Sequence, residues 1–284
     1  VRTSPHHSDV RGDLCQLRNA LSDMKSVFGQ ITLTGGEPLM SASFWDILGV
    51  CAALGYKTGI TTNGILLNES SISRLAELGV DKISVSLDSL DSSVNEWLRP
   101  HQDFRDYTAH VVRMVKMLAK LHKRPSVTLL QTITAENVKC FEQMLHFARD
   151  FGVGLLPNIV HLQSSLRQSR SLSRFDSSDL ALLERTLQNW AFGVPSLQKY
   201  AAVVMSVLNE KQITVPLHCP MGDDAFYACW DGTLHPCFHR YDLVVGSLFR
   251  DGAAAVLRWR QPEKIKMASC INLGCACMPA ASRG

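Results

Sequence analysis

Three short polar segments each follow a stretch that the sequence predicts to be a buried strand. They are residues 35–38 (GGEP), 61–64 (TTNG) and 86–88 (SLD). In the first, two glycines let the backbone approach a ligand closely, and Glu37 supplies negative charge for an ammonium group. In the third, Ser86 and Asp88 share one face of a strand, so both side chains can reach a sugar hydroxyl. Each segment taken alone also fits ordinary turn chemistry, and Asp88 also fits a helix cap.

Cysteine supplies the second chemical signal, because six of the nine cysteines fall in the last quarter of the chain. Cys219 and Cys237 flank residues 230–233 (WDGT), whose Asp-Gly pair predicts a hairpin turn that brings the two thiols together. Clustered thiolates without a histidine at zinc-finger spacing suit either an iron–sulfur cluster or an all-cysteine zinc site. The others in this group are Cys229, Cys270, Cys275 and Cys277. We expect Cys229, inside the hairpin, to pack in the interior, with metal ligation as the alternative.

Strands and helices alternate along the first half of the chain. Short β-branched stretches predict strands at 30–34, 57–61, 82–87, 126–132 and 153–156. Amphipathic stretches predict helices at 14–28, 44–54, 69–78, 107–121 and 135–151. This alternation favours a parallel sheet with crossover helices. We therefore expect an α/β fold: a partial (β/α)6 TIM-like barrel whose first strand is missing, with a small C-terminal Cys-rich cluster-binding module.

Composition and charge exclude several classes of protein. The 284 residues are 46% apolar and 19% charged, with a net charge of +3, which is typical of a folded globular chain and not of a disordered one. That charge gives no electrostatic basis for binding nucleic acid. No apolar run approaches ~18 residues, so no membrane span is expected. We expect a cytoplasmic protein. The first residue is Val1 rather than methionine, which suggests a fragment or a processed product.

The three polar segments, in this order and at these spacings, resemble the radical SAM superfamily. The likeness is closest to the branch that contains the molybdenum-cofactor GTP cyclase and the SPASM/twitch peptide-modifying enzymes. Residues 126–152 also resemble the fifth strand and helix of that branch, so the resemblance covers nearly the whole chain. It implies a partial radical SAM barrel over 1–160, a helical linker over 161–212 and a SPASM/twitch-like auxiliary cluster domain over 213–284.

The resemblance implies a binding site for S-adenosylmethionine (SAM) at the ends of the strands. The segment 35–38 would hold the amino group of the methionine moiety, Ser86 and Asp88 would contact the ribose, and Leu156 would border the adenine. The full set of implied residues is Gly35, Gly36, Glu37, Pro38, Thr61, Asn63, Ser86, Asp88, Thr132, Asn137 and Leu156. Arg99 is an alternative member that reaches the barrel mouth or else lies on the surface.

One departure from the family concerns the cluster that cleaves SAM. The family binds this [4Fe-4S] cluster through a CxxxCxxC loop ahead of GGEP, and no such motif occurs in this sequence, where Cys15 stands alone. Three thiolates leave one iron open for SAM, which one thiolate cannot do. The hypothesis is that the chain is truncated upstream of Val1, so the cluster that cleaves SAM exists only if the missing CxxxCxxC motif exists. The rival hypothesis is a degenerate, non-catalytic relative.

The resemblance also implies an auxiliary [4Fe-4S] cluster in the C-terminal module. Cys219 and Cys237 would bind it, and the tail would supply the remaining ligands from Cys270, Cys275 and Cys277. The tail sequence CINLGCAC is shorter than the full SPASM pattern, which favours one auxiliary cluster over two.

The function implied is a radical SAM enzyme that reductively cleaves SAM to a 5′-deoxyadenosyl radical for hydrogen abstraction, namely a peptide-modifying or dehydrogenating maturase. The alternatives are a GTP cyclase-like molybdenum-cofactor enzyme and a non-catalytic Fe–S scaffold. The implied partners are a small-molecule or peptide substrate and a cytosolic electron donor of flavodoxin or ferredoxin type. No catalytic side chain is assigned by the sequence.

Overall fold

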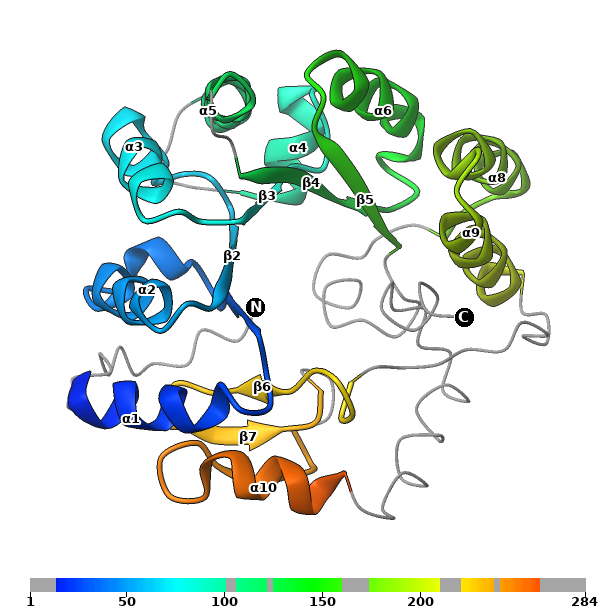
Figure 1. Cartoon of the computed structure of the whole chain (residues 1–284). Helices are drawn as coiled ribbons and strands as arrows, with labels where there is room; N and C mark the ends of the chain where they lie inside the picture. Colours follow the sequence, from blue (N-terminus) through cyan, green and yellow to red (C-terminus); the bar gives the residue numbers. More distant parts are fainter. Residues whose placement is uncertain are drawn as a thin grey trace. The chain divides into compact units, whose positions relative to one another are not determined.

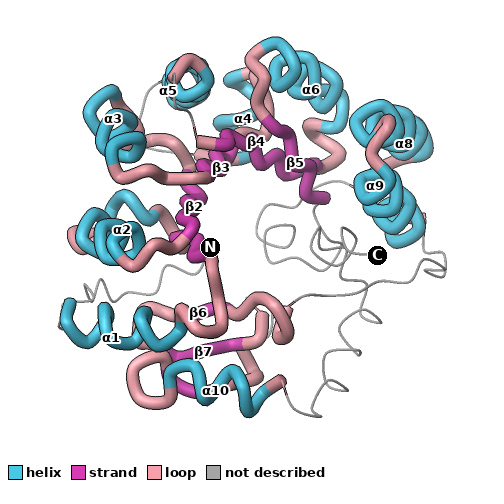
Figure 2. The backbone as a smooth tube through the Cα atoms, in the orientation of Figure 1, coloured by secondary structure: helices cyan, strands magenta, loops and turns pink. Residues whose placement is uncertain are grey.

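The computed structural model describes residues 14–100, 106–121, 125–159, 174–209, 221–237 and 241–260. These residues belong to two compact units. The first unit takes those between 30 and 52 and between 57 and 190. The second takes 14–29, 53–56 and those from 191 onward. Figure 2 distinguishes the helices, strands and loops along the chain.

Five parallel strands form the sheet of the first unit. They are β1 (Gln30–Leu33), β2 (Lys57–Thr62), β3 (Lys82–Ser86), β4 (Ser126–Ile133) and β5 (Gly154–Ile159). The strands are hydrogen-bonded in chain order, so each pairs with the strand that follows it in the sequence. Because they are parallel, all five carboxyl ends lie at the same edge of the sheet.

Helices fill the connections between these strands. They are α2 (Phe44–Ala53), α3 (Glu69–Glu77), α4 (Ser92–Leu98), α5 (Tyr107–Ala119) and α6 (Phe141–Asp150), with α8 (Ser177–Ala191) following β5. Figure 1 shows α2, α3, α5 and α6 on the outer side of the curved sheet. Strand side chains that face these helices, such as Ile60, Ile83 and Leu129, are fully buried and form the core. The predicted α/β class and parallel sheet are confirmed.

The opposite, concave face of the sheet carries polar and small residues instead of core residues. Side chains alternate between the two faces of a strand, so Thr61, Ser84 and Thr128 point away from the helix-covered face. Register places Thr61 beside Ser84, Ser84 beside Thr128, and Thr128 beside Gly154. The two faces of one sheet therefore differ in chemistry, with core packing on one and hydroxyl groups on the other.

Helix α4 lies between the predicted strand 82–87 and the predicted helix 107–121, in a segment for which the sequence pattern predicts no helix. The Asp91 carboxylate accepts hydrogen bonds from the backbone N–H of Ser93 (2.8 Å) and Val94 (3.4 Å), which begins the helix. A hydrogen bond from the Ser93 hydroxyl (2.6 Å), together with these backbone bonds, holds the pKa of Asp91 below its ordinary value. The helix is only seven residues long, too short for a periodic apolar pattern to show, so its cap was the only local signal.

The second unit combines both ends of the described chain. It contains α1 (Leu14–Met24), α9 (Pro195–Leu208), α10 (Gly252–Trp259) and an antiparallel sheet of β6 (Tyr227–Ala228), β7 (Thr233–His235) and β8 (Gly246–Ser247). The hairpin turn expected at Asp231-Gly232 joins β6 to β7, and Gly232 takes a φ of 81° there. Helix α1 packs against α10, and Asp23 Oδ2 accepts a hydrogen bond from the backbone N–H of Ala253 at 2.7 Å.

This division differs from the predicted boundaries 1–160, 161–212 and 213–284. Helix α1, expected within the barrel, belongs to the compact unit of the C-terminal hairpin, and α8, expected in the linker, extends the first unit to Trp190. Trp190 Nε1 donates to the carbonyl of Leu155 on β5 at 2.8 Å, which explains why α8 stays with the sheet. Within the described ranges, no helix has the length and apolar character needed to cross a membrane.

The contact between Asp23 and α10 predicts a local stability effect. We expect Asp23→Ala to lower the free energy of unfolding by about 1 kcal/mol, because an N–H of the first turn of α10 then lacks its acceptor. Asp23→Asn keeps an acceptor oxygen and is the matched control, with an expected loss well below that of alanine. Urea unfolding followed by circular dichroism measures both, and equal losses would contradict a capping role.

Candidate functional site

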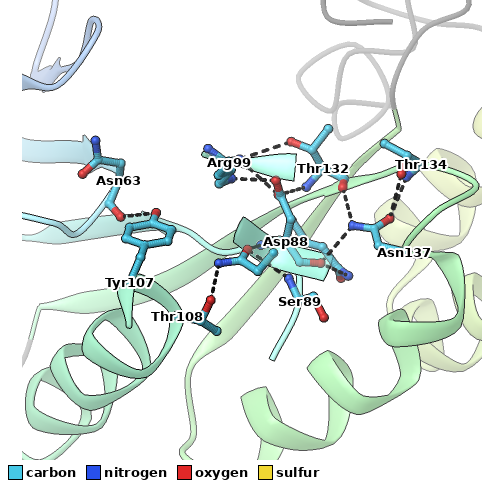
Figure 3. A network of polar contacts seen from close by, with 11 residues as sticks. Asn63, Asp88, Ser89, Arg99, Tyr107, Thr108, Thr132, Thr134 and Asn137 are labelled. Carbon is cyan, nitrogen blue, oxygen red and sulfur yellow. Dashed lines mark hydrogen bonds and ion pairs between the residues drawn. The ribbon is translucent and has the colours of Figure 1, made fainter. Parts of the chain in front are cut away.

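The carboxyl edge of the parallel sheet gathers all the residues that the sequence assigns to a ligand site. The segment 35–38 follows β1, Thr61 and Asn63 lie at the end of β2, and Ser86 ends β3. Thr132 lies near the end of β4, Asn137 follows it, and Leu156 lies on β5. Figure 3 shows the polar contacts that tie part of this edge together.

Glu37 joins the turn after β1 to the turn after β2. Its Oε1 accepts hydrogen bonds from the Thr62 hydroxyl (2.7 Å) and from the backbone N–H of Leu39 (3.2 Å). Its Oε2 accepts one from the backbone N–H of Asn63 (2.7 Å). Both carboxylate oxygens are thus engaged within the chain, and Glu37 also caps the short 3₁₀ turn that begins at Pro38. Glu37 therefore connects two neighbouring turns through hydrogen bonds, and the sequence did not predict this role.

Gly35 and Gly36 leave the backbone of the first turn accessible. Both are exposed, Gly35 has a φ of 150°, and a Cβ added at either one meets no described atom within 4 Å. Gly64 serves a different purpose, because its φ is 83° and a Cβ there would lie 3.2 Å from Val111. Gly64 therefore permits close packing, whereas Gly35 and Gly36 offer their backbone to a ligand.

Tyr107 fixes the position of the second turn from outside the sheet. It is the first residue of α5 and fully buried, and its hydroxyl donates to the carbonyl of Asn63 at 2.7 Å. Asn63 Oδ1 accepts from the backbone N–H of Ile65 at 2.9 Å, so its side chain also shapes the turn. Burial raises the pKa of Tyr107 from 10.0 to about 12.

The raised pKa of Tyr107 predicts an alkaline loss of stability. The folded chain keeps this proton at a pH where the unfolded chain has lost it, so the stabilisation is complete below pH 10 and is lost as the pH rises toward 12. Tyr107→Phe removes this titration together with one hydrogen bond of about 1 kcal/mol. Between those two pH values, the free energy of unfolding should fall more steeply with pH for the native chain than for the variant. Parallel pH profiles would contradict it.

Asp88 forms a bidentate ion pair with Arg99. Arg99 Nε lies 2.6 Å from Asp88 Oδ2 and Nη2 lies 3.1 Å from Oδ1, while Asp88 Oδ1 also accepts from the backbone N–H of Thr132 at 2.7 Å. The side chain of Asp88 is 5% exposed and that of Arg99 is 25% exposed. Burial lowers the pKa of Arg99, but the Asp88 carboxylate more than offsets this and holds it above its ordinary value. The edge therefore carries a guanidinium that is fixed by Asp88 and belongs to a partly exposed side chain.

Two buried asparagines hold the loop that carries Asp88. Asn95 Oδ1 on α4 accepts from the backbone N–H of Asp88 at 2.9 Å. Asn137 Nδ2 donates to the carbonyls of Asp88 and Thr132, both at 2.9 Å, and its Oδ1 accepts from the backbone N–H of Thr134 at 2.7 Å. The side chains of Asn137 and Asp88 are thus occupied within the protein, and they position the strand ends (Figure 3).

The groups left to face a ligand are fewer than the sequence suggested. Ser86 is half-buried, and its hydroxyl has no hydrogen-bond partner among the described residues. Leu156 lies level with Leu130 and Ser86 across three strands, and both leucines are half-buried. The open backbone of Gly35 and Gly36 and the guanidinium of Arg99 complete this set. It offers backbone polar groups, a hydroxyl, a cation and an apolar surface.

Sequence reasoning missed three residues that build the edge: Thr62, Asn95 and Tyr107. The sequence does carry a signal for Thr62, because strand alternation puts it on the face opposite to Thr61. The sequence carries no such signal for Asn95 and Tyr107, since each acts through a contact with another segment of the chain. Arg99, which the sequence left open, reaches the edge through its pair with Asp88.

The cysteines are only partly within the described chain. Cys237 is buried and Cys229 is partly buried, and burial and the nearby Asp231 raise the pKa of the Cys229 thiol. Cys219, Cys270, Cys275 and Cys277 lie outside the described residues. Within the described ranges, no group of three histidine, cysteine, aspartate or glutamate side chains could hold a metal ion. The predicted auxiliary cluster therefore stays a prediction.

The first unit is a parallel α/β protein whose carboxyl strand ends present open backbone, a hydroxyl and a guanidinium on the same edge. Residues 16–148 match the sequence profile of the Radical SAM superfamily. Residues 16–148 thus carry a radical SAM domain, and members of that superfamily use SAM and a [4Fe-4S] cluster. The family identified by its motif order is confirmed.

Two curated relatives show which proteins the sequence is similar to. The tungsten-containing aldehyde ferredoxin oxidoreductase cofactor-modifying protein of Pyrococcus furiosus is 30% identical over 131 residues, which are 45% of this chain and 36% of that protein. A probable GTP 3′,8-cyclase of Sulfurisphaera tokodaii is 26% identical over 226 residues, which are 75% of this chain and 66% of that protein. The chain therefore spans between one third and two thirds of the length of these relatives.

Among solved structures, SuiB of Streptococcus suis has a similar fold. The crystal structure of SuiB superposes with a TM-score of 0.65 at 15% identity, covering 94% of this chain and 65% of SuiB. The structure of SuiB bound to SAM gives a TM-score of 0.64 at 15% identity, covering 90% of this chain and 60% of SuiB. At this identity the likeness concerns the fold alone.

Proposed function

We propose that this chain binds SAM at the carboxyl edge of its sheet and serves in a radical SAM enzyme that abstracts hydrogen from a substrate. The observation that carries the proposal is the set of ligand-facing groups at that edge, which match the parts of SAM. When bound there, SAM supplies a 5′-deoxyadenosyl radical on one-electron reductive cleavage. The family membership of residues 16–148 supports the same conclusion.

Each ligand-facing group suits one part of SAM. The exposed backbone of Gly35 and Gly36 offers carbonyl oxygens to the ammonium group, since the carboxylate of Glu37 is already engaged. Arg99, held by Asp88, offers its partly exposed side chain to the methionine carboxylate. The Ser86 hydroxyl suits a ribose hydroxyl, and Leu130 with Leu156 suits the adenine ring.

Asp88, Asn137, Glu37 and Asn63 act indirectly in this proposal. Their side chains bind other parts of the protein, so they orient the groups that contact SAM rather than contacting it themselves. Thr61 lies on the concave face, next to Thr62 in the sequence. The hydroxyl of Thr132 accepts a hydrogen bond from Arg99 Nη2 at 3.5 Å. This assignment narrows the larger set implied by the family resemblance.

The cluster that cleaves SAM does not fit the residues of this sequence. No CxxxCxxC motif occurs in the 284 residues, and Cys15 is exposed on α1 without neighbouring thiols in the sequence. We therefore assign no residue to that cluster and derive no step through it. For the auxiliary cluster, Cys237 is suitably buried, and we keep Cys219, Cys270, Cys275 and Cys277 as its proposed co-ligands.

A peptide is the proposed substrate, and GTP is the second candidate. The fold likeness to SuiB, which has a structure bound to its precursor peptide SuiA, supports a peptide-modifying or dehydrogenating maturase. The match over three quarters of this chain to a probable GTP 3′,8-cyclase favours the cyclase alternative. An electron donor of flavodoxin or ferredoxin type is proposed for either enzyme.

SAM binding to the chain is the first test. We expect Ser86→Ala to weaken SAM binding roughly fivefold to tenfold in isothermal titration, because one hydrogen bond contributes about 1 kcal/mol. Ser126→Ala, at the exposed opposite end of β4, is the matched control and should leave the affinity unchanged. If the native chain does not bind SAM, or if both variants weaken binding equally, the proposed site is wrong.

Activity is tested on the full-length protein after anaerobic cluster reconstitution. Release of 5′-deoxyadenosine with SAM and dithionite is expected, and substrate-dependent release with a peptide or with GTP separates the two candidates. Absence of release from a fully reconstituted protein that binds SAM would instead support the non-catalytic scaffold.

A further inference from the structure

One buried side-chain oxygen behind the ligand edge has no role in any assignment above. Gln131 on β4 is fully buried on the helix-covered face of the sheet, the face that also carries Leu129 and Ile133. Its Nε2 donates to the carbonyl oxygen of Asp88 at 3.1 Å. Its Oε1, in contrast, is buried and has no hydrogen-bond partner among the described residues. Buried polar atoms are nearly always hydrogen-bonded, so this oxygen indicates that a partner is needed.

Reversing the amide of Gln131 does not give Oε1 a donor. The carbonyl oxygen of Asp88 is an acceptor, and it also accepts from Asn137 Nδ2 at 2.9 Å. In the reversed amide Oε1 would face this carbonyl oxygen, which places two acceptors against each other. The hydrogen bond from Nε2 to Asp88 therefore fixes the amide, and Oε1 has to find its donor elsewhere.

The sheet around Gln131 supplies no donor to this oxygen. Pro157 on β5 is paired in register with Gln131 and is buried, and proline has no backbone N–H. Leu129 and Ile133, which flank Gln131 on its own face of β4, are fully buried and apolar. A donor for Oε1 therefore has to come from the loop that follows β3, where the Asp88 carbonyl already binds the same amide.

A hydroxyl hydrogen is available in that loop. Ser89 follows Asp88 directly and is fully buried. Its backbone N–H donates to Asn95 Oδ1 at 3.3 Å, and its hydroxyl oxygen accepts from the backbone N–H of Asp91 at 2.9 Å. A serine hydroxyl also has one hydrogen to donate, and neither of these bonds uses it. The Gln131 amide and the Ser89 hydroxyl thus both lie beside the peptide group that joins Asp88 to Ser89.

We propose that the interior of the first unit binds one water molecule, which donates a hydrogen bond to Gln131 Oε1 and accepts one from the Ser89 hydroxyl. Two such bonds are within the range of two to four that buried waters make. The ligand has to donate one hydrogen bond and accept another, which water does and a metal cation does not. The water ties the loop that carries Asp88 to β4. The inference is independent of SAM binding, because Gln131 lies on the face of the sheet opposite to the concave one.

The direct test is a crystal structure of this chain at a resolution that shows ordered water. We expect a density peak about 2.8 Å from Gln131 Oε1 that is also within hydrogen-bond distance of Ser89 Oγ. The peak should be absent from the structures of Ser89→Ala and Gln131→Met. A dry site in the native chain, or a Ser89 hydroxyl that bonds Oε1 directly with no water between them, would overturn the proposal.

Thermal unfolding of a double-mutant cycle gives a second readout in solution. Ser89→Ala and Gln131→Met each remove one bond of the water, and we expect each to lower the unfolding temperature by roughly 2–4 °C. The shift of the double variant should be clearly smaller than the sum of the two, because the first substitution already releases the water.

Ser71→Ala is the matched control for this cycle. The Ser71 hydroxyl is also buried, but it both accepts from the backbone N–H of Asn68 at 2.8 Å and donates to the carbonyl of Asn68 at 3.0 Å. Its shift should therefore add to that of Gln131→Met. If the shifts of Ser89→Ala and Gln131→Met add in the same way, no water joins the two residues and the proposal is wrong.

Discussion

Asp88→Ala should destabilise the first unit by about 3 kcal/mol and abolish measurable SAM binding. The substitution strands the partly buried Arg99 guanidinium and removes the acceptor of the Thr132 N–H. The guanidinium, which the pair now holds in place, would then be free to move away from the strand ends. Urea unfolding and isothermal titration with SAM measure the two effects on one protein sample.

Two further variants separate charge pairing from shape. Asp88→Asn keeps the size of the side chain and one acceptor oxygen, so we expect roughly half the loss of stability seen with alanine. In Asp88→Ala/Arg99→Met the unpaired charge is gone, and part of the stability should return relative to Asp88→Ala alone. If the double variant is as unstable as the sum of the single ones, the ion pair is not what holds this loop.

Glu37→Ala should lower the free energy of unfolding by about 3 kcal/mol and weaken SAM binding more than tenfold. The carboxylate joins the turns after β1 and β2 through three hydrogen bonds, from Thr62, Asn63 and Leu39. Hydrogen bonds to a charged group contribute about 1.5–3 kcal/mol each, and water replaces part of this at a half-buried site. Without them, the open glycine turn loses its fixed position against β2.

Glu37→Gln distinguishes bracing from direct contact with the ligand. Glutamine keeps one oxygen that can accept from Asn63 or Thr62, so a brace should retain most of the stability and most of the affinity for SAM. If the carboxylate instead binds the ammonium group of SAM, glutamine should lose affinity while stability is unchanged. Comparing unfolding and titration for this variant therefore tests the sequence interpretation of Glu37 directly.

Where the sequence predicted the positions of these residues in the fold, local rules were sufficient. Each polar turn follows a β-branched strand, and parallel strands must bring their carboxyl ends to one edge, so the sequence alone places Gly35, Ser86 and Thr132 together. The family resemblance then indicated SAM, because it depends on the order of turns along the chain. The helix α4 and the grouping of α1 with the C-terminal hairpin were not predictable in this way.

The roles of individual residues were harder to predict than their positions in the fold. Glu37, Asp88 and Asn137 were assigned to ligand contact by the family resemblance, and Glu37 and Asp88 also because they are charged and follow strand ends. Their hydrogen bonds go to Thr62, Arg99 and other groups of the protein. Whether a carboxylate is left free for a ligand depends on which donors from distant segments reach it, and spacing along one strand carries no information about those donors.

The sequence by itself determined the order of strands and helices, the polar strand ends and the superfamily, since each depends on neighbours within a few residues or on motif order. Only the tertiary structure decided that Arg99 is fixed by Asp88, that Tyr107 holds Asn63, and that Asn95 and Asn137 hold the backbone of Asp88. These contacts join segments from different strands and helices. Their existence depends on register and packing, which form only when the whole sheet folds.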